Sequence, residues 1–199
     1  MPRPILYFVR HGETDWNRER RLQGQHDIPL NDLGRAQAAR CGVVLRGLLE
    51  RHRRAADGLD FVSSPLGRAR ETMELMRAGL GLQPQAYRTD IRLMEMSFGR
   101  WEGFTFAELQ AREAAALAER ERDKWGFVLP GGESYAQLQV RVRAWYDSVT
   151  CDTVVAAHGG VCRVLIEHLG LAPPRAASMG DIGQGVVYVF DGKGMARHE

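Results

Sequence analysis

The stretch ILYFVRHGET, residues 5–14, joins a continuous apolar run to a polar turn. Five consecutive apolar residues rich in β-forming types predict a strand buried on both faces, as in a parallel sheet covered by helices. The polar residues that follow at once begin with Arg10, His11 and Gly12. Ligands of open α/β sheets bind beyond the carboxyl ends of the strands. We therefore expect this strand to deliver an arginine and a histidine to a ligand-binding edge.

Similar runs and helical patterns alternate along the rest of the chain. Further strands are predicted at residues 60–62, 153–157 and 186–190, and helices at 31–49, 64–80, 105–123, 133–149 and 160–169. We expect Asn31 to cap the first of these helices and Ser64-Pro65 to open the second. The alternation, without a linker or an internal repeat, predicts an α/β three-layer sandwich in which helices flank a mostly parallel central sheet. It predicts one domain over residues 1–199.

Composition places the chain among soluble globular proteins. Lys and Arg exceed Asp and Glu by 2, and 44% of the residues are hydrophobic, so we expect neither a nucleic-acid nor a membrane partner. Only Lys124 and Lys193 are lysines, and the other 25 basic residues are arginine. Arginine is the side chain best shaped to bind carboxylate or phosphate bidentately. This bias suggests an anionic ligand.

Cysteine usage and the N-terminus favour a cytoplasmic protein. Cys41, Cys151 and Cys162 lack the paired spacing of a zinc site or a redox motif. The apolar run at residues 5–9 is too short for a signal-peptide core or a membrane span. We therefore expect reduced thiols and a cytoplasmic location.

Phosphoryl chemistry is indicated by the residues at three strand ends and in one loop. Arg68 follows the second predicted strand, and His158 follows the strand at 153–157. Guanidiniums bind phosphoryl oxygens bidentately, and a neutral imidazole can attack phosphorus and carry the group covalently. Glu95, flanked by methionines, is the candidate proton donor for the leaving oxygen. Such a site needs no metal or other cofactor, because fixed cations stabilise the transferring group.

A metal-assisted hydrolase is the competing interpretation of the same residues. His11, Glu13, Asp15 and His158 are all metal-ligand types. However, no helical two-histidine spacing is present, and the neighbouring arginines would repel a cation. We therefore predict that no metal is bound.

The segment VRHGETDWN at residues 9–17 resembles the signature of the histidine phosphatase superfamily, also called the phosphoglycerate mutase-like family. The resemblance continues in register over nearly the whole chain. It includes QG at 23–24, PLNDLG at 29–34, SPLGRARET at 64–72, Glu95 with FGRWEG at 98–103, PGGES at 130–134 and AHGG at 157–160. So many ordered matches imply the phosphoglycerate mutase-like fold.

The resemblance also implies catalytic roles for five residues. His11 would be the phosphorylated nucleophile, and Arg10 and Arg68 would bind the phosphoryl oxygens. His158 would complete the pocket as a further donor. Glu95 would act first as the general acid and then as the general base.

Five more residues are candidate substrate or phosphate contacts. The resemblance implies that Asn17 touches the phosphate region and that Gln23 and Gly24 line the substrate entrance. Gly159 lacks a side chain, which lets a ligand approach the backbone. Arg21 lies between Asn17 and Gln23 in the sequence, where positive charge would attract an anionic substrate.

Within the superfamily, the middle of the chain favours hydrolysis. The segment at residues 104–129 is short and contains no adjacent arginine pair, unlike the longer basic segment of cofactor-dependent mutases. It is similar to the small broad-specificity phosphatases and to α-ribazole phosphatase. We therefore expect a metal-independent phosphomonoesterase acting on a small phosphorylated metabolite, as a monomer or homodimer. A cofactor-dependent phosphoglycerate mutase and a non-catalytic phospho-ligand-binding protein are the alternatives. The sequence leaves the substrate open among α-ribazole phosphate, sugar phosphates, phosphoglycerates and others.

Overall fold

A six-stranded sheet forms the centre of the computed structural model, which describes residues 3–199. Its strand order is β3-β2-β4-β1-β5-β6. The strands are β1 (Leu6–Arg10), β2 (Asp60–Ser63), β3 (Arg88–Thr89), β4 (Thr153–Ala157), β5 (Val187–Phe190) and β6 (Met195–His198). The pairs β3-β2, β2-β4 and β4-β1 are parallel, whereas β5 runs antiparallel to both β1 and β6. The mostly parallel sheet expected from the sequence is confirmed.

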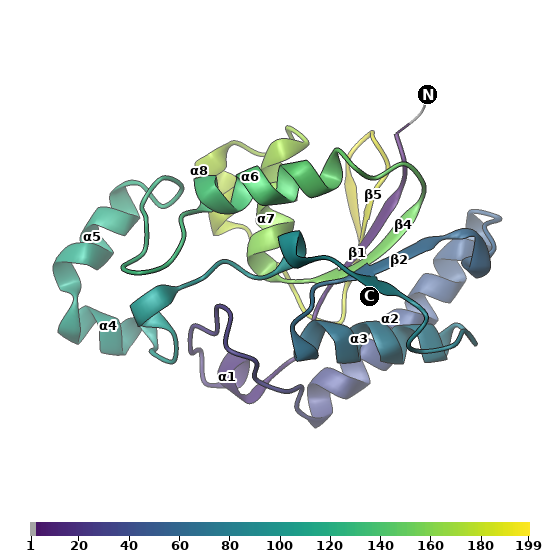
Figure 1. Cartoon of the computed structure of the whole chain (residues 1–199), viewed down its shortest axis with the longest axis horizontal. Helices are drawn as coiled ribbons and strands as arrows, with labels where there is room; N and C mark the ends of the chain where they lie inside the picture. The colour runs from purple at the N-terminus through teal and green to yellow at the C-terminus, as the bar shows by residue number, and fades with distance from the viewer. Residues whose placement is uncertain (1–2) are drawn as a thin grey trace.

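Helices cover both faces of this sheet (Figure 1). One face packs against α2 (Asp32–Arg51) and α3 (Gly67–Gly79), and the other against α6 (Tyr135–Tyr146), α7 (Gly159–His168) and α8 (Pro174–Met179). Side chains of a strand alternate between the two faces. In β1, Tyr7 and Val9 join the core beneath α2 and α3, while Leu6 and Phe8 join the opposite core. This double burial explains the uninterrupted apolar run and confirms the three-layer architecture.

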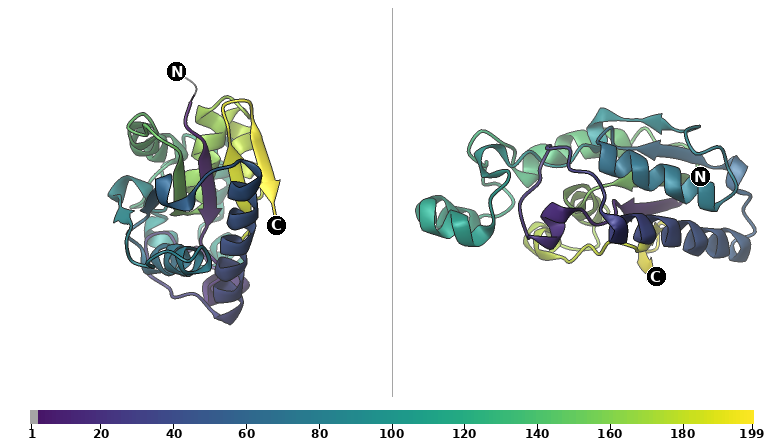
Figure 2. Two further views of the ribbon diagram at one scale, coloured as in Figure 1. Left: turned by 90° about the vertical axis from the view of Figure 1, so that its right-hand side faces the viewer. Right: turned by 90° about the horizontal axis from the view of Figure 1, so that it is seen from below.

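Two helices project from one end of the layered body (Figures 1 and 2). They are α4 (Phe106–Arg112) and α5 (Ala114–Arg122), and buried Leu109 and Leu117 join them to the core on the α6 side. The one-turn helix α1 (Asp15–Arg18) follows β1. Short 3-10 turns occur at Ala56–Gly58, Ile91–Leu93 and Gly99–Trp101. The projecting helices thus lie beyond the carboxyl ends of the parallel strands, where the site is expected.

Several helix boundaries differ from the sequence prediction. Asn31 caps α2 as expected, because its side chain accepts a hydrogen bond from the Gly34 amide at 2.9 Å. The helix expected from Ser64-Pro65 instead begins at Gly67. The single helix expected over residues 105–123 is wrong: it is broken at Glu113, whose φ of −136° and ψ of 40° are not helical. Strands β3 and β6 and helices α1 and α8 were not predicted.

Candidate active site

Two histidines meet where three neighbouring parallel strands end. His11 follows β1 and His158 follows β4, whose last residue pairs in register with Arg10. The two imidazole centroids lie 5.2 Å apart. Ser64, directly after β2, places its Oγ 2.7 Å from Nε2 of His158. The parallel register therefore brings together residues that are far apart in the sequence.

The backbone holds His11 in one tautomer. Its Nδ1 lies 2.8 Å from the carbonyl oxygen of Gly12, and because a carbonyl oxygen only accepts, Nδ1 carries the proton. In the neutral ring, Nε2 then carries the lone pair. Burial, followed by the positive charges of Arg68 and Arg10, holds the pKa of His11 well below its usual range. The ring is therefore neutral near pH 7, and its Nε2 can act as a nucleophile.

Buried arginines flank this imidazole, and backbone carbonyls fix them in place. Arg68, in α3, is fully buried and donates from its two Nη atoms to the carbonyl oxygens of His26 at 2.6 Å and Gly24 at 2.7 Å. Arg10 donates from Nη1 to the carbonyl oxygen of Ile182 at 2.7 Å. Among residues 3–199, neither guanidinium forms an ion pair; burial lowers the pKa of both, against an opposing effect of nearby Glu95. Both guanidiniums are thus oriented and remain available to an anion.

Three buried nitrogen atoms around His11 lack a hydrogen-bond partner among residues 3–199. They are Nε of Arg10, Nε of Arg68 and Nδ1 of His158. Burial and the charge of Arg68 hold the pKa of His158 well below its usual range, so this ring is also neutral and its Nδ1 donates when the Ser64 hydroxyl donates to Nε2. An unmade hydrogen bond at a buried group costs about 1–3 kcal/mol. A phosphoryl group, with several acceptor oxygens, would satisfy these donors.

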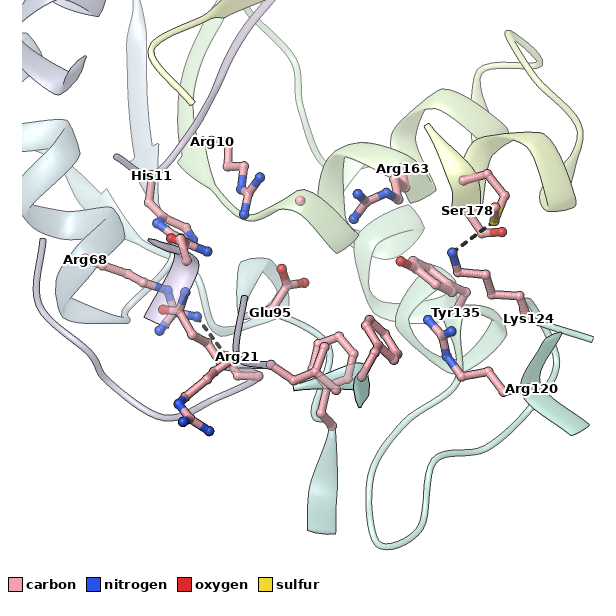
Figure 3. Close-up of a pocket in the computed structure, with 18 residues that line it drawn as sticks. Arg10, His11, Arg21, Arg68, Glu95, Arg120, Lys124, Tyr135, Arg163 and Ser178 are labelled. Atoms are coloured by element: carbon pink, nitrogen blue, oxygen red, sulfur yellow. Dashed lines mark hydrogen bonds between the residues drawn. The ribbon is translucent and has the colours of Figure 1, made fainter. Parts of the chain in front are cut away.

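Glu95 borders the same cavity and lies between His11 and the residues near α5 (Figure 3). Both of its carboxylate oxygens lie 3.2 Å from the Gly160 amide nitrogen, and Oε1 also accepts from the Met96 amide at 2.9 Å. Its own carbonyl oxygen accepts from Gln25 at 3.1 Å and Arg141 at 3.0 Å. The loop that carries Glu95 is therefore fixed by hydrogen bonds at both backbone and side chain.

The predicted entrance residues border the same cavity of about 250 Å³ as His11 and Glu95. They include Asn17, Gln23, Gly24 and Gly159. A Cβ at Gly159 would lie 3.1 Å from Nη1 of Arg163 and 3.6 Å from Nε of Arg10, which fits the expectation that its missing side chain leaves room at the anion site. The structure thus places these four residues around one cavity. Their contacts with substrate stay a prediction.

Arg21 also borders the cavity, but its guanidinium is already paired. Nη1 lies 2.8 Å from the carbonyl oxygen of Gly103 and 3.0 Å from Oε2 of Glu108, and Nε lies 2.8 Å from Oε2 of Glu19. Two carboxylates therefore offset its charge. Any attraction of an anionic substrate by Arg21 is correspondingly reduced.

A second cationic group lies in the same cavity and was missed by sequence reasoning. Arg120 of α5, Lys124 after α5 and Arg163 of α7 line the side away from His11 and Arg68 (Figure 3). The sequence offered one signal, because Arg120 and Lys124 are four residues apart, as neighbours on a helix face would be. Their approach to Arg163 depends on the tertiary fold.

The described residues show neither a cluster of metal ligands nor a membrane-spanning helix. Among residues 3–199, no group of three or more His, Cys, Asp or Glu side chains is arranged to hold a metal ion. Over the same range, no helix combines the length and the apolar character needed to cross a membrane.

Sequence comparison matches most of the chain to a family of phosphoryl-transfer proteins. Residues 6–197 match the family described as histidine phosphatase superfamily (branch 1). A probable phosphoglycerate mutase, GpmB, from Salmonella paratyphi C is 36% identical over 139 residues. The match covers 70% of this chain and 60% of that relative's length.

Solved structures extend the similarity to nearly the whole fold. TTHB049 from Thermus thermophilus is 36% identical, with a TM-score of 0.68, over 94% of this chain and 93% of that chain. A mycobacterial glucosyl-3-phosphoglycerate phosphatase, Rv2419c, is 30% identical, with a TM-score of 0.78, over 94% and 89%. With the family match over residues 6–197, these likenesses establish that the chain belongs to the histidine phosphatase superfamily.

Proposed function

We propose that this protein is a metal-independent phosphomonoesterase that hydrolyses a small phosphorylated metabolite through a phosphohistidine on His11. The observation that carries the proposal is the state of His11: a neutral ring, with the proton fixed on Nδ1, lies beside buried nitrogens that have no acceptor among residues 3–199. The nucleophilic lone pair on Nε2 of His11 therefore lies next to a site that can bind an anion. The phosphatase named among the related structures supports the same class of reaction.

In the first step, Nε2 of His11 attacks phosphorus, and the bond between phosphorus and the ester oxygen breaks. The electron pair of that bond goes to the leaving oxygen, which takes a proton from the Glu95 carboxyl group. Nδ1 keeps its proton and its hydrogen bond to the Gly12 carbonyl oxygen. Arg10, Arg68 and His158 donate to the phosphoryl oxygens, and each such donor is worth roughly 100-fold or more in rate.

In the second step, water hydrolyses the phosphohistidine. Glu95, now a carboxylate, takes a proton from water as the water oxygen attacks phosphorus. The phosphorus–nitrogen bond breaks, and its electron pair returns to Nε2 of His11. Inorganic phosphate leaves, and the protonated Glu95 and neutral His11 are restored, so the cycle needs no other reactant.

Phosphoglycerate mutase is the second candidate. The probable mutase named among the relatives and the basic residues Arg120 and Lys124 in the middle segment favour it. A mutase returns the phosphoryl group from histidine to an organic acceptor instead of water. Dependence of 3-phosphoglycerate isomerisation on 2,3-bisphosphoglycerate would identify it. A binding protein would retain phosphate without turnover, and α-ribazole phosphate stays one of the candidate substrates.

The test measures phosphate release from p-nitrophenyl phosphate and a panel of sugar phosphates, phosphoglycerates and α-ribazole phosphate, with a chelator present. We expect turnover by the wild type and none by His11→Ala. Rapid acid-free quenching with radiolabelled substrate should trap a base-stable, acid-labile phosphoenzyme in the wild type only. His198→Ala, a histidine substitution on the edge strand β6, is the control and should keep full activity. Full activity of His11→Ala, or loss of wild-type activity with the chelator, would overturn the proposal.

A further inference from the structure

The catalytic cavity has a second cluster of positive charge that the phosphoryl chemistry does not use. Arg163, Lys124 and Arg120 lie across Glu95 from His11 and Arg68 (Figure 3). They come from two elements, α5 with the loop after it and α7. A cavity of about 250 Å³ spans both groups, so a ligand larger than a phosphate group would contact the two at once.

Little negative charge offsets this cluster. The Arg120 side chain is buried, and its only ion pair within the described part of the chain is with Glu121, at 3.1 Å, whose side chain is 61% exposed. Lys124 Nζ has Met179 Sδ as its hydrogen-bond partner, at 3.1 Å, and Arg163 Nε donates to the Gly180 carbonyl oxygen at 2.9 Å. Among residues 3–199, neither Lys124 nor Arg163 forms an ion pair.

The pKa of Lys124 reflects its burial and the unfavourable proximity of these positive charges. Burial, followed by the like charges of Arg120 and Arg163, lowers the pKa of Lys124 to about 8, against a smaller opposing effect of Glu121. Burial also lowers the pKa of Arg120. Like charges held together out of water favour any anion that enters between them.

We propose that Arg120, Lys124 and Arg163 form a subsite for a second anionic group, a carboxylate or a phosphoryl group, on the phosphomonoester that His11 attacks. The inference rests on the proposed function and narrows its substrate class. Phosphomonoesters with a charged tail would engage both cationic groups, whereas those with a neutral tail would leave the second group unpaired. Tyr135, buried and bordering the same end of the cavity, supplies a wall for the tail.

The experiment compares substrates that differ only in the second charge. 3-Phosphoglycerate is paired with glycerol 1-phosphate, in which a hydroxymethyl group replaces the carboxylate. Fructose 1,6-bisphosphate is paired with fructose 6-phosphate to distinguish a phosphoryl group from a carboxylate. Loss of a hydrogen-bonded ion pair changes affinity about tenfold or more. We therefore expect the wild type to favour the charged member of at least one pair by that factor in kcat/KM.

Variants of Lys124 test whether this residue carries the preference. Lys124→Gln should lower the ratio of kcat/KM values within the preferred pair about tenfold, chiefly through KM. In the wild type the ratio should fall as pH rises through about 8, while Lys124→Arg, which stays charged, should keep it. Lys193→Gln is the matched control, because Lys193 is the other lysine and lies exposed in the turn before β6.

Failure of this inference differs from failure of the proposed function. If the wild type hydrolyses both members of each pair equally and Lys124→Gln changes no ratio, the subsite is wrong while the phosphatase stands. If no phosphomonoester is hydrolysed, the proposed function fails, and the shift in Tm with 3-phosphoglycerate against glycerol 1-phosphate tests the subsite. A larger shift for 3-phosphoglycerate that Lys124→Gln removes would still support it, and equal shifts would overturn it.

Discussion

Gly160 holds Glu95 in the cavity through its amide and through its lack of a side chain. The amide nitrogen lies 3.2 Å from each oxygen of the Glu95 carboxylate, and a Cβ at Gly160 would lie only 2.3 Å from Oε1. No real Cβ approaches an oxygen that closely, so the carboxylate occupies the space that a side chain would fill. The position of the proposed proton donor thus depends on a glycine at the start of α7.

Gly160→Ala should therefore impair catalysis more than folding. The new methyl group would displace the carboxylate of Glu95 from its proton-donating position, and a misplaced catalytic group costs about 100-fold in kcat. The Tm should fall only modestly, because the close contacts of the new Cβ, with Oε1 of Glu95 and with Cδ2 of Leu138 at 3.2 Å, are both with the ends of side chains that can shift. Steady-state kinetics and a thermal melt measure both effects.

Gly47→Ala provides the matched control. Gly47 lies within α2, and a Cβ there would meet no atom within 4 Å. Alanine in a helix interior is about 0.5–1 kcal/mol more stable than glycine, so this variant should keep its activity and gain slightly in Tm. Wild-type kcat in Gly160→Ala would contradict the assigned position of Glu95.

Glu95→Gln should reveal proton donation through its dependence on the leaving group. An alkoxide needs a proton as it departs, whereas the p-nitrophenolate anion leaves without one. We expect kcat for alkyl phosphates to fall about 100-fold to 10,000-fold, and formation of the phosphoenzyme from p-nitrophenyl phosphate to fall much less. Rapid-quench kinetics with both substrate types separate the two effects. An equal loss with both leaving groups would show that Glu95 has another role.

Elements buried on both faces were predictable from the sequence. The sequences of strands β1 and β4 are nearly uninterrupted apolar runs because a hydrophobic core lies on each side of these strands. The positions of His11 and His158 follow from the same reasoning, since each directly follows such a strand. Their approach across β1 and β4 also required these two strands to be neighbours in the sheet, which the sequence pattern did not specify.

Elements with weak patterns escaped prediction. Strand β6 carries exposed Ala196 and Arg197 at the edge of the sheet, so no apolar run marks it. The break at Glu113 lies inside a run of good helix formers, where local propensity predicts one continuous helix. The approach of Arg120 to Arg163 depends on where α5 is placed.

Arg68→Lys should impair both the anion site and the entrance loop. Arg68 binds the carbonyl oxygens of Gly24 and His26 through two nitrogens while its Nε stays free for an anion. A single ammonium group cannot reproduce this planar arrangement. We expect kcat to fall about 100-fold to 1,000-fold and Tm to fall as well. Arg70→Lys, an exposed position on the same helix, should change neither, and a similar loss there would indicate a general helix effect.

Folding stability should decrease in mild acid because two histidines are buried in the neutral form. His11 and His158 have pKa values held well below 6.5, first by burial, whereas in the unfolded chain both titrate near that value. As pH falls below 6.5, the unfolded chain binds protons that the native protein does not. The free energy of unfolding should therefore fall with pH by up to about 1.4 kcal/mol per pH unit for each histidine.

Urea unfolding between about pH 7.5 and about pH 5 measures this slope. Compared with the wild type, His158→Gln should lose the part of the slope that one histidine contributes, and the double variant with His11→Gln should lose both parts. The quantity compared is the slope of the unfolding free energy against pH, so a constant loss of stability caused by a substitution does not affect it. The remaining ionisable groups contribute the same slope to every variant. Equal slopes in all three proteins would mean that these imidazoles bind protons in the folded protein as readily as in the unfolded one. His11 would then be largely protonated in mild acid, and its Nε2 lone pair would be available to attack phosphorus only at higher pH.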